Sequence, residues 1–484
     1  MKRGVSGVFL GAAVRVATLA ACLAASRDGL ARGGDPITKG PWMQHVTATS
    51  AVVRVEVDPP APVTIEIGMS AAVGSTDAGA GSVIESREVR ALHSILVKGL
   101  EPATRYPFTV RVGTTTKYGA ITTAPTDNST ESFRFLVYGD NRSDEAAHAA
   151  VVVAMTSKAS SFVVNTGDLV ERGDSRTEWQ QFFDIEAPLT RERPIYSVVG
   201  NHELTDGSGI DYVRYFGPAD LPKEIVAPAP SVTGVLLHDA GAPQLTLDQL
   251  SGTFRWGNTR FFLINGMVPF TSGPTRAWLE KVLTDADQEP GLVWRIVVVH
   301  HGPWSSGPHG DNKLLQDAKV PALLREHKVD LVMSGHDHIY ERGTAEGLPY
   351  LVSGGGGAPV YRVKKAEATS RRYESVRHFV EATVSPVAIQ FVAMRSDGST
   401  IESCALAKGI GWECDGSGAG DGGSAGAANG ADASRAPASP SRCGCRAAGS
   451  DGEPNARNAG VLVVCALAAA GTLLARRARS RSVR

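Results

Sequence analysis

The sequence predicts an α/β domain, with a central sheet flanked by helices, preceded by a smaller all-β sandwich. Between residues 36 and 125, apolar and polar residues alternate with the period of half-buried strands. From residue 130 to 397, short apolar runs alternate with helix-compatible stretches, which is typical of a sheet covered by helices. The chain has 484 residues, too many for one hydrophobic core, so at least two domains are expected.

Composition and charge narrow the class of protein. Hydrophobic residues make up 42% and charged residues 20% of the chain, so most of it can form a buried core. The formal net charge is −1, and no long basic stripe stands out in the middle of the chain. Because proteins that bind nucleic acid through charge are basic, we expect no nucleic-acid partner.

The β region, residues 36–125, contains four runs with strand periodicity, separated by turn-forming residues. The runs are Ser50–Val57, Val63–Ile67, His93–Val97 and Tyr106–Val112. The stretch that ends at Tyr106 resembles the corner before a late strand in fibronectin type III-like sandwiches, with Tyr106 as the corner tyrosine. Plain core packing is an alternative role for Tyr106, and the two roles are compatible.

The α/β region, residues 130–397, contains six apolar runs of the length expected for buried strands. They are Phe133–Tyr138, Phe162–Asn165, Ile195–Val199, Phe261–Ile264, Ile296–Val299 and Leu331–Met333. Helices are expected between them, for example at Ser143–Ser157 and Pro274–Asp285.

The most informative residues follow these strands. Five strands lead into motifs that contain possible metal ligands: Gly139-Asp140, Gly167-Asp168, Gly200-Asn201-His202-Glu203, His300-His301 and Gly335-His336-Asp337-His338. The carboxyl ends of strands are where sites assemble in α/β sheets, and glycine lets the backbone turn sharply beside a ligand. A turn, a helix cap or a surface histidine pair explains any one motif alone. Five of them directly after strands predict a metal site.

These motifs, in this order, resemble those of the calcineurin-like metallophosphoesterases over about residues 133–395. The preceding β region makes the chain similar to the purple acid phosphatase-like branch, in which a sandwich precedes the catalytic domain. Lys39–Gln44 resembles the opening of that sandwich. The resemblance implies two metal ions, and a mixed set of oxygen and nitrogen ligands suits Fe, Mn or Zn.

The resemblance also implies which residues bind the metal ions. The expected ligands are Asp140, Asp168, Asn201, His301, His336 and His338, with Asp168 bridging both ions. The family's ligand near the paired histidines lies two residues before a proline, here Pro303. His301 is therefore preferred, and His300 is expected to pack or to lie behind the ligands.

Three further residues are candidates for contact with a substrate. His202 is placed to bind phosphate or to protonate the leaving oxygen, or alternatively to fix Asn201 through a hydrogen bond. Arg142 stays protonated and cannot bind a metal, so it either clamps a phosphate oxygen or lies on the surface. His309, in a polar and glycine-rich loop, either contacts substrate or is an exposed loop residue.

The chain departs from the family at two positions. Where the family often has His or Tyr two residues after the first aspartate, or Tyr three residues after the second, this chain has Arg142 and Glu171. The tyrosine behind the purple colour is absent, so we expect a colourless enzyme whose first metal need not be iron. Glu171 either fills that coordination position or faces solvent. Gly354–Gly357 lacks the lysine of a P-loop and is expected to form a tight turn near the site.

These features predict a phosphomonoesterase of the acid phosphatase type, in which a metal-activated hydroxide attacks a small-molecule phosphate ester. A phosphodiesterase with the same site is one alternative, and a non-catalytic metal-binding surface protein is another. The presence of every principal ligand argues against the second alternative. A metal-dependent nuclease is disfavoured by the near-neutral charge.

The N-terminus, residues 1–31, resembles an export signal. Lys2 and Arg3 precede an apolar run from Val8 to Ala25, which Arg15 interrupts. A buried first helix is a weaker interpretation because the run has no polar face. The residues before Cys22 also resemble a bacterial lipoprotein box. We expect an exported protein at the cell surface, in the outer membrane or secreted.

The C-terminus changes in composition after Cys414. Residues 415–442 are rich in Gly, Ala and Ser and predict a flexible linker. Residues 443–484 carry a cysteine motif, an apolar stretch at Ala459–Ala475 and a basic tail, a layout that resembles the sorting tails of myxobacterial surface proteins. The apolar stretch is expected to be a transmembrane segment that anchors the protein before processing, with the arginines on the cytoplasmic side. Upstream, Cys404 and Cys414 are either a disulfide pair or two free thiols.

Overall fold

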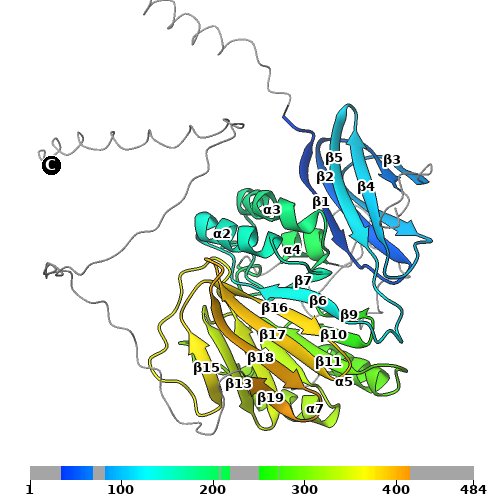
Figure 1. Cartoon of the computed structure of the whole chain (residues 1–484). Helices are drawn as coiled ribbons and strands as arrows, with labels where there is room; N and C mark the ends of the chain where they lie inside the picture. The colour runs from blue at the N-terminus through cyan, green and yellow to red at the C-terminus, as the bar shows by residue number, and fades with distance from the viewer. Residues whose placement is uncertain (1–33, 69–81, 206–208, 218–249, 272, 415–484) are drawn as a thin grey trace, which may run out of the picture. The chain divides into compact units, whose positions relative to one another are not determined.

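The computed structural model of the chain describes residues 34–68, 82–205, 209–217, 250–271 and 273–414, which form three β-sheets and several helices (Figure 1). The predicted export signal, the linker and the C-terminal segment lie outside these residues. Among the described residues, no helix has both the length and the apolar character needed to cross a membrane.

The N-terminal sheet is antiparallel and fits the predicted β-sandwich. Its strands are β1 (Ile37–Gln44), β2 (Ser50–Ile67), β3 (Ser82–Lys98), β4 (Arg105–Val112) and β5 (Thr115–Thr122). The long strand β2 pairs with β1 along its first half and with β4 near its end, and register shifts separate the two halves between Glu56 and Val63. Tyr106 Oη accepts a hydrogen bond from the backbone N–H of Glu101 at 2.8 Å, as a corner tyrosine would. The fibronectin type III assignment itself stays a prediction.

The first sheet of the α/β region has seven strands in the order β19-β18-β17-β16-β6-β7-β8. Their bounds are β6 (Phe133–Tyr138), β7 (Phe162–Asn165), β8 (Ile195–Ser197), β16 (His378–Val384), β17 (Ala388–Arg395), β18 (Thr400–Ala407) and β19 (Gly411–Cys414). Strands β6, β7 and β8 are parallel to one another. The sheet continues past the expected boundary at residue 397, and a disulfide joins Cys404 to Cys414 in its last two strands, which confirms that expected pair.

The second sheet also has seven strands, in the order β15-β13-β14-β12-β11-β10-β9. Their bounds are β9 (Gly252–Trp256), β10 (Thr259–Ile264), β11 (Trp294–Val299), β12 (Leu331–Ser334), β13 (Tyr340–Ala345), β14 (Leu348–Ser353) and β15 (Ser370–Glu374). Strands β10, β11, β12 and β14 are parallel.

The helices cover the outer faces of the two sheets. They are α2 (Glu145–Thr156), α3 (Arg176–Thr190), α4 (Ile210–Phe216), α5 (Pro274–Asp287), α6 (Lys313–Asp317) and α7 (Val320–Glu326). Figure 1 shows α2, α3 and α4 close together beside the sheet that contains β6 and β7, and their apolar residues share one buried cluster with that sheet. Helices α5 and α7 share another cluster with β10 and β11.

Alternate residues of the central strands enter different cores. In β11, Ile296 and Val298 lie in the core between the two sheets, whereas Val297 and Val299 pack against helices. Successive side chains of a strand point to opposite faces, so a strand that is buried on both faces must be apolar throughout. This burial explains the continuous apolar runs by which the sequence predicted these strands, and it confirms the α/β architecture.

Candidate metal centre

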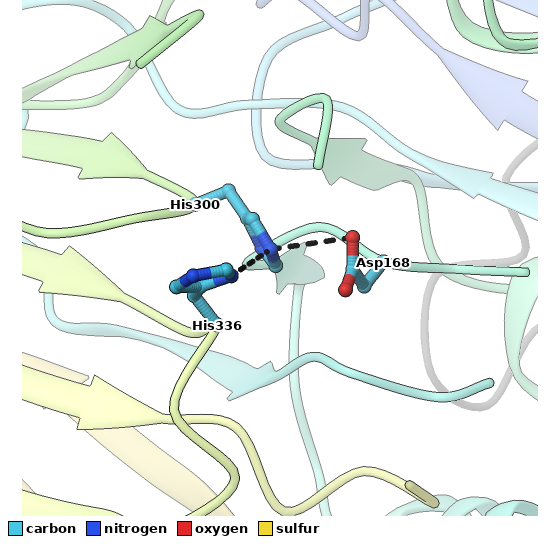
Figure 2. Close-up of side chains that lie close together, drawn as sticks. All are labelled: Asp168, His300 and His336. Carbon is cyan, nitrogen blue, oxygen red and sulfur yellow. Dashed lines mark hydrogen bonds and ion pairs between the residues drawn. The ribbon is translucent and has the colours of Figure 1, made fainter. Parts of the chain in front are cut away.

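The residues expected to bind metal lie at the carboxyl ends of parallel strands from both sheets. Asp140, Asp168 and Asn201 follow β6, β7 and β8 in the first sheet, and the histidines follow β11 and β12 in the second. Figure 2 shows Asp168 and two of the histidines pointing toward one another. Strand ends of two facing sheets thus form one polar centre, as the sequence indicated.

The backbone is strained where several of these residues occur. Asp140, Asp168 and His336 have φ angles of 57°, 55° and 68°, in the left-handed region that side chains other than glycine seldom adopt. Gly167 (φ 97°) precedes Asp168, and a Cβ atom there would lie 2.7 Å from Nδ1 of His300. Strain of this kind persists at functional sites where the surroundings hold it in place.

One group of ligand atoms converges on His300. Its Nε2 lies 3.2 Å from Oδ1 of Asp168, 3.2 Å from Oδ1 of Asn201 and 3.2 Å from Nδ1 of His336. The Nδ1–H of His300 donates to the carbonyl oxygen of Thr166 at 2.8 Å, which fixes the ring with Nε2 toward the group. Side-chain atoms of Asp168, His300 and His336 all lie within 4.8 Å of one another, as the ligands of a single ion do.

The paired histidines occupy different places from those expected. His300 is buried in the centre, whereas His301 directs Nε2 away from it and donates to the carbonyl oxygen of Gly310 at 2.9 Å. The ring of His301 packs on that of His336, with 4.3 Å between centroids. The geometry therefore favours His300 as the ligand and gives His301 a supporting position, opposite to the expectation based on Pro303.

A second group lies around Asp140 and His338. Asp140 is fully buried, and its Oδ1 has no hydrogen-bond partner among the residues that the structure describes. That oxygen lies 3.5 Å from Nε2 of His338, whose Nδ1–H donates to the carbonyl oxygen of Pro359 at 2.7 Å. A buried carboxylate oxygen without a donor is costly unless a cation approaches it, so these side chains fit a metal ion.

Arg142 lies over this second group. Its Nε donates to Oδ2 of Asp168 at 3.1 Å, and its Nη2 lies 3.3 Å from Nε2 of His338. Its Nη1 donates to Oε2 of Glu171 at 2.7 Å, and the Arg142 side chain is only 12% exposed. Arg142 is thus part of the site rather than a surface residue, and Glu171 pairs with Arg142 instead of approaching Asp140.

His202 lies at the edge of the centre. Its Nδ1–H donates to the carbonyl oxygen of Glu171 at 2.7 Å, which leaves Nε2 directed toward Asp168, 3.9 Å from Oδ2. The His202 backbone N–H donates to Oδ1 of Asp168 at 3.1 Å. No side-chain contact with Asn201 is seen among the described residues, so the geometry supports a role for the ring in the site.

The charged groups of the site strongly shift one another's pKa values. Burial alone would lower the pKa of His300, but the charges of Asp168 and Asp140 raise it to about 9. Burial would raise the pKa of Asp168, but His300 above all holds it below its ordinary value. Burial, and then the neighbouring histidine charges, lower the pKa of His336 to about 2, so this ring is neutral. A cation that binds at His300 must therefore displace a proton, as metal ions commonly do.

Glu203 supports the centre in a way that the sequence did not reveal. Its two oxygens accept hydrogen bonds from the backbone N–H groups of Asp168, Leu169, Val170 and Gly200, at 3.0, 2.7, 3.3 and 2.8 Å. The side chain is fully buried, and burial raises its pKa to about 7. Glu203 thereby joins the loops after β7 and β8, which carry Asp168 and Asn201.

The loop that carries His309 is held against the site by Asp337. This carboxylate accepts hydrogen bonds from the Ser305 hydroxyl at 2.5 Å and from the His309 backbone N–H at 3.1 Å. The His309 ring lies on that of His336, with 4.2 Å between centroids. Tyr361, another residue that the sequence did not indicate, stacks on His338 at 3.9 Å. The position of His309 is compatible with contact to a substrate at the site.

The glycine run Gly354–Gly357 turns beside the first ligand strand. The backbone N–H of Gly356 donates to the carbonyl oxygen of Gly139 at 2.7 Å, and that of Ala358 donates to the carbonyl of Asp140 at 2.8 Å. This agrees with the expected tight turn near the site.

Comparison with known proteins shows a similarity in the α/β region. Residues 133–340 match the family model of the calcineurin-like phosphoesterases. Over these residues, which are less than half of the chain, the sequence is similar to that family, and the similarity implies divalent or trivalent metal ions.

Individual relatives are more distant. An uncharacterised protein of Mycobacterium tuberculosis is 27% identical over 306 residues, which cover 56% of this chain and 56% of that protein. Purple acid phosphatase 4 of Arabidopsis thaliana is 28% identical over 220 residues, 40% of this chain and 58% of the relative. The chain thus spans little more than half the length of these relatives.

Two solved structures share the fold. The purple acid phosphatase PPD1 from yellow lupin seeds (Lupinus luteus) has a TM-score of 0.60 at 18% identity, over 76% of this chain and 74% of its own. The structure of PhoD has a TM-score of 0.60 at 13% identity, over 81% of this chain and 94% of its own. These likenesses confirm the predicted fold class.

Proposed function

We propose that the protein is a dinuclear metal-dependent phosphoesterase that hydrolyses monoesters of phosphate. The carrying observation is that ligand atoms from five strand ends meet around Asp168, whose two oxygens face two different groups. Its Oδ1 faces His300, and its Oδ2 faces the side on which Arg142 and His338 lie. A carboxylate in this position can offer one oxygen to each of two ions.

The proposed ligands follow from these two groups. Asp168, Asn201, His300 and His336 would hold one ion, and Asp140, Asp168 and His338 the other. Bound ions would supply an activated water and stabilise negative charge on the phosphoryl oxygens. Carboxylate, amide and imidazole ligands suit Fe, Mn or Zn.

The remaining side chains would bind and protonate the ester. Arg142 has a planar group of donors that can hold phosphate oxygens once they compete with Asp168 and Glu171. His202 presents Nε2 toward the same side and would give a proton to the leaving alcohol oxygen. A guanidinium in addition to two cations favours a dianionic monoester over a monoanionic diester, which supports monoesterase activity.

The test is hydrolysis of p-nitrophenyl phosphate and bis-p-nitrophenyl phosphate by purified protein before and after removal of metal with a chelator. We expect close to two metal ions per chain, metal-dependent hydrolysis, and a higher kcat/KM for the monoester. A preference for the diester would replace the monoesterase by the phosphodiesterase. Metal-loaded protein that hydrolyses neither ester would favour a metal-binding surface protein.

We also propose that the protein acts outside the cytoplasm. The apolar run near the N-terminus and the Cys404–Cys414 disulfide support export, because such bonds persist in oxidising compartments. Detection of the oxidised protein in surface or extracellular fractions of the producing cell is the expected result. Detection of reduced protein in the cytoplasm alone would contradict it.

A further inference from the structure

A cavity of about 590 Å³ lies directly beside the metal centre. Arg142 and Glu171 form the wall that it shares with the centre, and the opposite side is formed by residues of α2 and α3. Pro359, whose carbonyl oxygen holds the His338 ring, also lines it. Cavities of this size hold small organic ligands. A phosphate at Arg142 would therefore lie next to a space that can take the rest of an ester.

The floor of the cavity is mainly apolar. Leu169 and Val170 follow the metal-binding loop after β7, and Phe182 and Ile185 come from α3. Most of this floor is rigid, because Leu169, Val170 and Phe182 belong to the buried cluster between the helices and the sheet. A preformed apolar floor favours a bulky, mainly apolar group over water.

Asn141 also lines the cavity, but its amide group is buried inside the fold. Asn141 is buried, and its Oδ1 accepts a hydrogen bond from Nδ2 of Asn165 at 2.6 Å, which fixes the orientation of the amide. Nδ2 of Asn141 has almost no accessible surface, and a Cβ atom on Gly356 would lie 3.0 Å from it. The amide of Asn141 therefore offers no donor to a ligand in the cavity.

The charged residues at the mouth do not select a cationic ligand. Asp144 pairs with Arg377 at 2.8 Å, Glu171 with Arg142 at 2.7 Å, and Glu178 with Arg172 at 3.2 Å. Glu145 lies in the first turn of α2, where the helix dipole favours a negative charge. Because these carboxylates are compensated within the fold, the apolar floor decides what binds.

We infer that this cavity binds the alcohol part of the substrate, and that the protein acts on phosphate esters of bulky, mainly apolar alcohols. The inference rests on the proposed function, because it places the phosphoryl group at Arg142 and the metal ligands. It names the substrate class that the same site prefers. Esters of small alkyl alcohols leave the apolar floor uncovered.

The test compares the binding of two phosphonates to full-length, metal-loaded protein by titration calorimetry. Methylphosphonate carries little more than the phosphoryl part, whereas 2-naphthylmethylphosphonate adds a bulky aromatic group. Neither contains an ester bond, so leaving-group reactivity does not enter the comparison. We expect 2-naphthylmethylphosphonate to bind at least about tenfold more tightly.

Variants at Gln181 test whether the preference for 2-naphthylmethylphosphonate arises from the cavity. Gln181 is a half-buried residue of the cavity wall on α3 and takes no part in the metal centre. We expect Gln181→Trp to weaken 2-naphthylmethylphosphonate at least about fivefold and methylphosphonate less than about twofold, because the indole fills the space. Gln181→Ala keeps the space open and should retain the preference. Thr177→Trp, at an exposed position of the same helix outside the cavity, is the matched control.

Two results would overturn the inference: equal affinity of the wild-type protein for both phosphonates, or equal weakening of both by Gln181→Trp. Failure of the proposed function looks different. A protein that prefers 2-naphthylmethylphosphonate but hydrolyses no phosphate ester would contradict the enzymatic proposal and leave the cavity assignment standing. Hydrolysis without this preference would contradict the cavity assignment alone.

Discussion

Asp168 separates two regions of the metal centre that are built differently. On its Oδ1 side, the side chains of Asn201, His300 and His336 bring their ligand atoms to 3.2 Å contacts around one point. On its Oδ2 side, Asp140 and His338 approach only to 3.5 Å, and the Arg142 guanidinium lies beside them. The first region is a compact set of ligands, and the second is open and already contains a positive charge.

This difference indicates that the two regions differ in metal affinity and in phosphate binding. The compact region offers four ligand atoms to one ion, with the orientation of His300 fixed by Thr166. The open region offers fewer protein ligands, because Glu171 pairs with Arg142. We therefore expect the compact region to hold its ion more tightly. The open region should bind its ion more weakly and should also provide a hydrogen-bond donor to the phosphate.

The largest effect is expected where both regions depend on one residue. Asp168→Asn removes the carboxylate charge shared by the two groups, so we expect loss of kcat/KM by at least about 1,000-fold and loss of most bound metal. Asp174→Asn, an exposed change in the loop before α3, is the matched control. Hydrolysis of p-nitrophenyl phosphate and elemental analysis measure the two outcomes. Full activity of Asp168→Asn would show that the two regions do not share this ligand.

Metal binding by the compact region is tested by replacing His300 and His301 one at a time. His300→Ala removes the atom on which the ligands converge, so we expect metal affinity to fall at least about 100-fold. His301→Ala removes a hydrogen bond to Gly310 and ring packing on His336, and we expect a loss of less than about tenfold. Metal titration of both variants measures the difference. A larger loss in His301→Ala would restore the assignment based on the proline spacing.

This pair also shows what the sequence could and could not predict. The ends of the buried strands were predictable because strands covered on both faces are continuous apolar runs. The spacing to Pro303 suggested His301, whereas the strand alternation favours His300. Val298 faces the core between the sheets and Val299 faces the helices, so the next residue, His300, returns to the inner side. Because Ile296–Val299 are all apolar, the sequence did not show which face each residue takes, and the structure was needed to distinguish His300 from His301.

Other features of the fold and the site could not be predicted from the local sequence. Glu203 stood in a recognised motif, but its four backbone hydrogen bonds join two loops that only the fold brings together. Strand β5 was missed because its threonines and lysine carry little apolar alternation, and pairing with β4 defines it. Tyr361 lies far along the chain from the ligands that it covers, so its stacking on His338 depends on tertiary structure.

The open region is tested by Arg142. Arg142→Ala removes donors to the phosphate, and a charge-assisted hydrogen bond contributes about 1.5–3 kcal/mol, so kcat/KM should fall about 10- to 100-fold. Arg142→Lys should restore only part of this loss, because a lysine cannot make the two-pronged contact. Glu171→Gln is the control that keeps the guanidinium while weakening its ion pair. Metal content is expected to stay within about twofold in all three variants. A gain of metal in Arg142→Ala would instead show that the guanidinium competes with the second ion.

The smallest effect is expected for His309, whose ring contacts the His336 ring at the edge of the compact region. Its ring packs on His336, and its backbone is held by Asp337, so the fold of the loop does not depend on the imidazole. His309→Ala should raise KM for p-nitrophenyl phosphate about threefold to tenfold, with kcat and metal content nearly unchanged, because one neutral hydrogen bond contributes about 1 kcal/mol. His327→Ala, at a histidine that pairs with Asp287 after α7, controls for the loss of an imidazole elsewhere. A fall in kcat without a change in KM would give His309 a part in proton transfer. The assignment of substrate protonation to His202 would then have to be divided between the two rings.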